Sequence, residues 1–201
     1  LYNPYWGYQE GKKRNSRVSS TSFPAFLLNY NLKYSKNSSH ALGFMFSKGK
    51  RSNSNLDWYN VSDPRPDYYQ YLPSAADNDV EKSLIENAWK SDISVYQINW
   101  NKFYQTNYQN YEWVKNINGS TDSLYGRRSL YALSDSHFDP LDIEIFESTS
   151  FKLKHNQFVE LLGRFEFSNT KYYQKLNDLL GGDYFIDYGK FVTSNYNKNP
   201  N

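Results

Sequence analysis

The feature that most constrains the fold is an alternation of apolar and polar side chains between residues 141 and 167. Side chains of a β-strand point to opposite faces in turn, so an alternating segment forms a strand with one apolar face. The polar pair His155-Asn156 divides this segment and predicts a tight turn. The apolar face comprises Leu141, Ile143, Ile145, Thr149, Phe151, Leu153, Val159, Leu161, Gly163, Phe165 and Phe167. The pattern predicts a β-hairpin.

An earlier segment has the same design, with a polar turn predicted at Ser35–His40. Its apolar positions are Phe26, Leu28, Tyr30, Leu32, Tyr34, Leu42, Phe44 and Phe46. Both turns are short, whereas about 80 residues separate the second strand from the third. Bacterial outer-membrane barrels combine short turns on one side with long loops on the other. A β-sandwich would instead place turns about every 8–12 residues.

The long connection contains helical spacing of its own. Apolar residues recur at helical intervals over Asn78–Ser91, with Asp77 or Asn78 as the predicted N-cap. A second helix is predicted over Ile98–Trp113, followed by a turn at Asn118-Gly119. After the second hairpin, the spacing over Tyr172–Leu180 predicts a third helix, which Gly181-Gly182 would end.

The composition agrees with strands that have one wet face. Aromatic residues make up 19% of the chain, yet its mean hydropathy is −0.86. No run approaches 18 apolar residues, so no membrane helix is predicted. The predicted fold class is all-β: a segment of an antiparallel transmembrane β-barrel, with about four strands in two hairpins and a long, partly helical extracellular loop.

The run LDWYNVSDPRPDYYQYLPS, residues Leu56–Ser74, is long and unusual in composition. This run and Asn3–Val18 resemble segments of large TonB-dependent outer-membrane receptors of the SusC/Oar-like type, which carry a carboxypeptidase-regulatory-like domain before the plug. Leu56–Ser74 is the strongest match. Shorter stretches match in the same order along the chain: Gln97–Trp100, Ser129–Leu133, Tyr172–Leu176 and Asp178–Tyr184.

The resemblance implies an internal segment of a 22-stranded barrel that surrounds an N-terminal plug. Residues 17–58 and 127–171 would be hairpins, 59–126 an extracellular loop, and 172–201 the start of the next loop. It also implies energised uptake of a nutrient ligand, such as a glycan, peptide or chelate, across the outer membrane of a Gram-negative bacterium. The implied partners are the rest of the barrel and plug, outer-membrane lipid, TonB and, in some members, a surface lipoprotein lid.

An aromatic and charged segment early in the long loop is the candidate ligand-binding site. Its predicted site residues are Asp57, Trp58, Tyr59, Asp63, Arg65, Asp67, Tyr68, Tyr69 and Tyr71. Aromatic platforms with carboxylates and a guanidinium suit a sugar or a peptide. The same residues also suit packing, because Pro64 and Pro66 fix the backbone and Arg65 can pair with Asp63 or Asp67. Both interpretations stay open at the level of sequence.

The charge distribution argues against a nucleic-acid partner. The net charge is +2, and the basic residues cluster only in the short runs Lys12–Arg14 and Lys48–Arg51. Four arginines near the predicted outer rim are expected to be solvated strand ends, rather than members of lumen ion pairs or lipopolysaccharide contacts: Arg14, Arg17, Arg127 and Arg128. In the second hairpin, Glu160, Arg164 and Glu166 alternate on the polar face and are expected to point into a lumen, where they would link strands or contact the plug.

The sequence predicts no enzyme, metal or cofactor. It has no cysteine, and none of His40, His137 and His155 has a partner at metal-ligand spacing. No nucleophile elbow, phosphate loop or dinucleotide fingerprint occurs.

Two alternatives to a transporter stay open. One is a barrel that serves as a scaffold without transport, and the other is a soluble β-rich glycan-binding module. The soluble module requires the apolar strand faces to meet in a core, whereas a barrel turns them to lipid.

Overall fold

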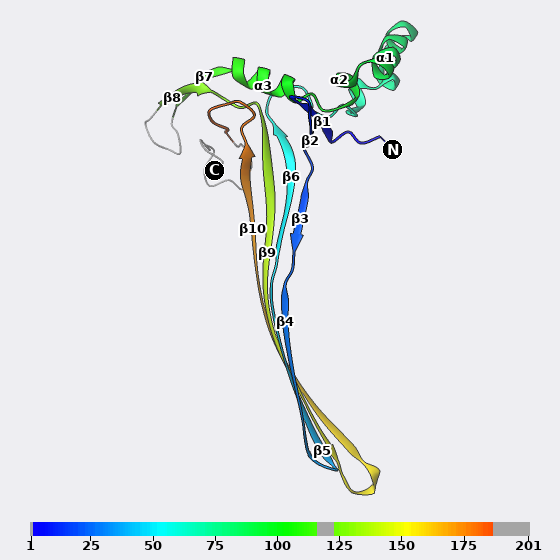
Figure 1. Cartoon of the computed structure of the whole chain (residues 1–201), viewed down its shortest axis with the longest axis vertical. Helices are drawn as coiled ribbons and strands as arrows, with labels where there is room; N and C mark the ends of the chain where they lie inside the picture. The colour runs from blue at the N-terminus through cyan, green and yellow to red at the C-terminus, as the bar shows by residue number, and fades with distance from the viewer. Residues whose placement is uncertain (1, 116–122, 187–201) are drawn as a thin grey trace. The chain divides into compact units, whose positions relative to one another are not determined.

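The computed structural model describes residues 2–115 and 123–186 (Figure 1). In this part of the chain antiparallel strands dominate and helices are few, which confirms the predicted all-β class. The chain divides into two compact units. The sheet unit comprises residues 19–52 and 137–173, and the loop unit comprises residues 1–18, 53–136 and 174–201.

Two antiparallel hairpins build the sheet unit. The first joins β4 (Ala25–Ser35) to β5 (Ser38–Lys48) through a turn at residues 36–37, and β3 (Ser19–Ser22) precedes it. The second joins β9 (Tyr131–Lys152) to β10 (Phe158–Asp178). Strand β5 pairs with β4 on one side and β9 on the other, and β10 pairs with the far edge of β9 (Figure 1).

The strand register places the apolar positions of these strands on one face. Phe44 pairs with Leu28 on β4 and with Ile145 on β9. The next residue, Met45, pairs with Leu27 and Glu144 and therefore belongs to the opposite face. Because a shift by one residue would exchange the two faces, the apolar pattern itself specifies this register.

Glycine and proline mark the points where the outer strands are interrupted. Gly49 separates β5 from β6 (Lys50–Trp58), and its N–H donates to the carbonyl oxygen of Pro140 at 2.8 Å. A side chain at Gly49 would overlap the ring of Phe23, so only glycine fits there. Pro24, which has no N–H to donate, lies at the neighbouring break between β3 and β4.

On the polar face, the ring of Phe146 lies over Gly43, where a β-carbon would overlap it. These two residues are paired across β5 and β9. The glycine therefore makes room for a large aromatic side chain among polar neighbours, as aromatic–glycine pairs do in designed sheets.

Charged side chains connect β9 and β10 on this polar face. Arg164 Nε lies 2.9 Å from an oxygen of Glu144, and Arg164 Nη2 lies 3.2 Å from Glu166. The Ser148 hydroxyl donates to Glu160 at 2.9 Å. The predicted strand-linking role is therefore confirmed for Glu160 and Arg164, whereas Glu166 pairs within β10. Such exposed ion pairs contribute only about 0–1 kcal/mol each.

The loop unit contains short strands and all the α-helices of the described residues. Its elements, beside parts of β6, β9 and β10, are β1 (Trp6–Gln9), β2 (Lys12–Asn15), η1 (Tyr69–Tyr71), η2 (Pro73–Ala75), α1 (Asp79–Ser91), α2 (Ile93–Tyr96), α3 (Trp100–Gln109), β7 (Tyr111–Lys115) and β8 (Ser123–Arg127). The helix predicted over Asn78–Ser91 is confirmed as α1. Asn78 is its N-cap, because the Asn78 side chain accepts a hydrogen bond from Glu81 N at 2.9 Å. No helix in the described ranges is long and apolar enough to cross a membrane.

The second predicted helix is shorter than expected, because α3 ends at Gln109 and β7 pairs with β8 immediately afterwards. The third prediction, a helix over Tyr172–Leu180, is wrong: β10 continues to Asp178. Pairing with β9 overrides the helical spacing there. The predicted turn at His155 is confirmed by its φ of 64° within η4 (Lys154–Asn156). The predicted Asn118-Gly119 turn lies outside the described residues.

The loop unit has its own hydrophobic core. Aromatic and aliphatic side chains from β6, α3, the start of β9 and the residues after β10 form it: Leu56, Ile98, Trp100, Phe103, Tyr131, Leu133 and Leu180. Trp100 and Leu180 have no exposed surface. This core gives α3 a fixed position against the strands of the same unit.

Candidate ligand-binding site

A cavity of about 470 Å³ lies in the loop unit. Its walls come from the segment 63–71, from α1, α2 and α3, and from the first residue of β9. The volume falls within the roughly 300–1,000 Å³ that is usual for small-molecule sites. Of the nine predicted site residues, Asp63, Arg65 and Tyr71 line this cavity.

Asp63 and Arg65 form a closely fitted ion pair at the cavity wall. The backbone N and the Nε of Arg65 each donate to Asp63 Oδ1 at 2.9 Å, and its Nη2 donates to Oδ2 at 2.6 Å. Partial burial alone would raise the pKa of the Asp63 carboxyl, but the bonds and charge of Arg65 outweigh it and hold that pKa below its usual range. The predicted pairing of Arg65 with Asp63 is confirmed.

This lowered pKa predicts how the stability of the segment depends on pH. Because the folded-state pKa of Asp63 lies below the unfolded value of about 3.9, its contribution is present above pH 4 and is lost as the pH falls through the folded value. We expect Asp63→Asn to lower the thermal unfolding midpoint at pH 7, and the difference from wild type to shrink below about pH 4. Asp67→Asn, at an exposed position of the same segment, is the control. A difference independent of pH would contradict the assignment.

The neighbouring tyrosines pack the base of this segment. The Tyr68 ring centroid lies 4.7 Å from that of Tyr69 and 5.3 Å from that of Tyr71, both in edge arrangements. The Tyr71 hydroxyl donates to the backbone oxygen of Asp63 at 3.2 Å. Burial of the Tyr2 hydroxyl raises its pKa to about 12, and the negative charge of the exposed Asp67 adds to this rise. The ring contacts of Tyr68 support the packing interpretation for that residue, whereas Asp67 and Tyr69 are exposed.

The first three predicted site residues lie away from the cavity wall. Asp57 accepts hydrogen bonds from the hydroxyl of Ser134 and, at 3.1 Å, from Gln174 Nε2, so it joins the strands. The guanidinium of Arg65 lies 5.7 Å from the ring centroid of Trp58. Tyr59 lies 4.6 Å beneath the guanidinium of Arg128. These side chains support the loop unit and do not line the cavity.

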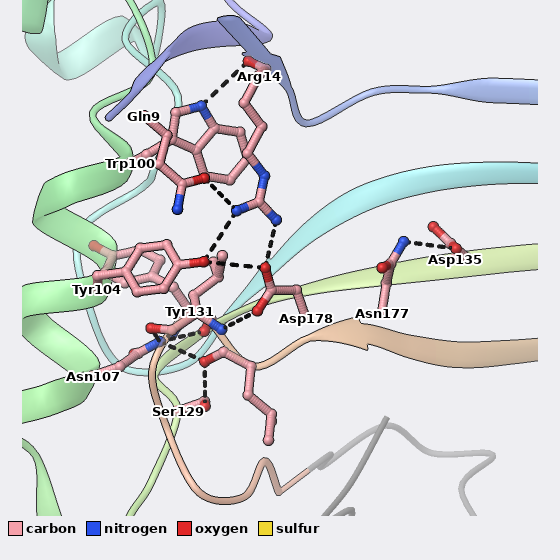
Figure 2. Close-up of polar contacts among 12 residues, drawn as sticks. Gln9, Arg14, Trp100, Tyr104, Asn107, Ser129, Tyr131, Asp135, Asn177 and Asp178 are labelled. Atoms are coloured by element: carbon pink, nitrogen blue, oxygen red, sulfur yellow. Dashed lines mark hydrogen bonds and ion pairs between the residues drawn. The ribbon is translucent and has the colours of Figure 1, made fainter. Parts of the chain in front are cut away.

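Sequence reasoning missed Asn107, which fixes the cavity's inner wall. This fully buried side chain donates from Nδ2 to the carbonyl oxygens of Tyr131, Leu179 and Leu180 at 2.7, 3.0 and 3.0 Å (Figure 2). Its Oδ1 accepts from the backbone N–H groups of Leu130 and Tyr131 at 2.8 and 3.0 Å. Three of these hydrogen bonds hold α3 to the start of β9, and two hold it to the residues that follow β10. Tyr131 is itself a cavity wall.

The spacing along α3 contains a signal for this residue. Asn107 follows Trp100 and Phe103 at intervals that place all three on one helical face. A polar residue within an apolar stripe must satisfy its hydrogen bonds inside the protein. That rule would have marked Asn107 as a buried polar anchor.

Arg14 forms the second anchor, which Figure 2 shows beside α3. Its Nη1 donates to Gln9 at 2.7 Å and to the Tyr104 hydroxyl at 3.1 Å, and its Nη2 donates to Asp178 at 2.6 Å. The guanidinium also lies 4.4 Å from the ring centroid of Trp100. Burial would lower the pKa of Arg14, but the bonds and charges of Asp178 and Tyr104 outweigh it and raise that pKa.

The prediction that the rim arginines are solvated strand ends is therefore wrong for most of them. Besides Arg14, Arg128 is 7% exposed and pairs with Glu112 at 2.8 Å. Arg127 pairs with Asp183 at 2.6 Å. Arg17 is exposed, as expected, and covers the ring of Tyr5. The partly exposed carboxylates of Asp178, Glu112 and Asp183, which lie 16 or more residues from their arginines, account for the difference.

The described residues contain no group of three or more side chains that could hold a metal ion. The cavity combines apolar walls with a few polar side chains, which suits capture of a small amphipathic molecule. Fold and cavity together define a β-rich protein with a folded, ligand-sized pocket in its long connection. No protein-family model matches the chain, and no curated protein matches it.

Proposed function

We propose that this chain forms part of the barrel wall of an outer-membrane TonB-dependent receptor, and that its loop unit captures a nutrient ligand outside the cell. The observation that carries the proposal is the apolar face of the sheet unit. Its exposed members come from β4, β5, β9 and β10: Phe26, Leu28, Tyr30, Leu42, Phe46, Ile145, Phe151, Val159, Leu161, Phe165 and Phe167. A contiguous patch of this kind is rare on soluble monomers.

The dimensions of this apolar face suit a bilayer. The nine residues Phe26 through Tyr34 extend about 30 Å at roughly 3.4 Å per residue. The apolar band of an outer-membrane barrel is about 25 Å tall. The opposite face carries the Arg164–Glu144 ion pair and polar hydroxyls, as the wet interior of a barrel does.

The open edges of the sheet support a larger barrel. Among the described residues, β4 and β10 each pair on one side only. Unpaired strand edges are not tolerated in lipid, because their N–H and C=O groups have no partner there. In the proposed assembly the remaining strands of the same polypeptide cover both edges, and the plug fills the lumen.

In this proposal the ligand, a glycan, peptide or chelate, first binds the loop unit. TonB then drives its passage through the barrel using the inner-membrane proton gradient. A surface lipoprotein lid would close over the loops in receptors that have one. The register of β4, β5 and β9 directly supports one part of this proposal, the lipid-facing band of the barrel.

The test is the denatured mass and the location of the native polypeptide that contains this sequence. We expect a mass on the order of 100 kDa in the outer-membrane fraction, as a large barrel with its plug requires. A mass near 23.8 kDa in a soluble fraction would refute the receptor and leave the soluble binding module. If deletion of the polypeptide leaves the uptake of every tested nutrient unchanged, the barrel is a scaffold and not a transporter.

A further inference from the structure

Part of the polar lining of the cavity, which we call the polar corner, comes from a single short stretch of chain. Gln97, which ends α2, the N-cap residue Asn99 and Lys102 on α3 all line it. The Asn99 side-chain oxygen accepts a hydrogen bond from Lys102 N at 3.0 Å. The side-chain nitrogen of Asn99 takes no part in this bond. This corner therefore offers a cation and an amide donor close together.

The charge of this corner is positive. The other cation in the lining, Arg65, is neutralised by its bonds to Asp63. Among the described residues, no ion pair engages Lys102, which is exposed and lines the cavity. Lys102 is thus available to an anion, and the positive end of α3 adds to its attraction.

The lining also has an apolar part. The rings of Phe103 and Tyr131 lie 4.5 Å apart with a 31° angle between their planes. Ile85 of α1 and Val95 of α2 continue this apolar part. These side chains offer an apolar group of a ligand a surface to cover.

Gln97 contributes an unmet hydrogen-bond acceptor. Its Oε1 is buried and has no partner among the described residues. Such a group costs about 1–3 kcal/mol while it stays unsatisfied. Because χ3 of glutamine is a soft torsion, a ligand N–H at the polar corner can recruit this oxygen.

We propose that the cavity binds a short apolar peptide through its free C-terminal carboxylate. The carboxylate pairs with Lys102 and Asn99, a peptide N–H reaches Gln97, and an apolar side chain lies against Phe103 and Tyr131. The assignment specifies the ligand class of the proposed receptor. The fate of the bound peptide rests on that proposed function.

The experiment measures binding to the native polypeptide by isothermal titration calorimetry. The probe is N-acetyl-leucyl-phenylalanine, compared with the same dipeptide ending in a carboxamide. We expect the acid to bind at least about tenfold more tightly than the amide, as a charge-assisted hydrogen bond allows. Lys102→Met should abolish that preference, whereas Lys82→Met, at an exposed position of α1, should keep it.

Two further probes test the peptide assignment. Gln97→Leu should weaken the dipeptide acid but leave octanoate, which has no N–H, unchanged. Equal binding of acid and amide, or octanoate binding as tightly as the dipeptide, would overturn the proposal. If the acid binds with the expected preference and cells take up no peptide, the cavity assignment stands and the receptor function fails.

Discussion

Replacing Ile145 with lysine is expected to destabilise the folded protein in lipid by about 2–4 kcal/mol, provided that the residue lies near the bilayer midplane. Ile145 pairs with Phe44 within the apolar face, and 41% of its surface is exposed in the sheet unit. If lipid covers this surface, a lysine there must carry its charge into hydrocarbon or distort the bilayer around it. If water covers it, the same change should stay within about 0.5 kcal/mol.

The measurement is a urea titration of folding into phospholipid vesicles. Ser148→Lys is the matched control, because Ser148 lies on the same strand but its hydroxyl bonds to Glu160 on the polar face. We expect this control to be close to wild type. An Ile145→Lys variant that is as stable as wild type would contradict a lipid-facing sheet. A loss of stability that persists without lipid would contradict it as well and favour a soluble core.

The predictability of this fold differs between the two units for a physical reason. In the sheet unit each strand carries its own period-two pattern, so neighbouring residues alone predict the strands and the turn at His155. The failure at Tyr172–Leu180 arises where local spacing is ambiguous and pairing with β9 decides. There, contacts such as Asn177 to Asp135 at 2.9 Å belong to a strand ladder that no local window contains.

In the loop unit, the predictable contacts are the local ones. Asp63 and Arg65 lie two residues apart, so their pairing could be expected from sequence. Arg14 and Asp178 are 164 residues apart, and their ion pair exists only because the strands bring them together. The lining of the cavity likewise combines Asp63, Arg65 and Tyr71 with Lys102 of α3, which no local window of the sequence contains together.

Asn107→Leu is expected to have the second large effect, a loss of about 3–5 kcal/mol in the local stability of the loop unit. Leucine keeps a similar volume but leaves the N–H groups of Leu130 and Tyr131, and the carbonyl oxygens of Tyr131 and Leu180, without the partner that Asn107 supplies. The carbonyl oxygen of Leu179 keeps its bond from the Ser129 hydroxyl. Each unsatisfied buried group costs about 1–3 kcal/mol, and relaxation recovers part of the sum.

Hydrogen–deuterium exchange measures this loss residue by residue. The amides of Leu130 and Tyr131 should exchange at least about 100-fold faster in Asn107→Leu, because local opening becomes easier by the stated free energy. Asn101→Leu, at an exposed position of α3, should leave their protection unchanged. Because Phe103 and Tyr131 form the apolar cavity wall, the Asn107 variant should also bind the dipeptide acid more weakly without losing its preference over the amide. Unchanged protection at Tyr131 would show that the core alone, and not Asn107, holds α3 against β9.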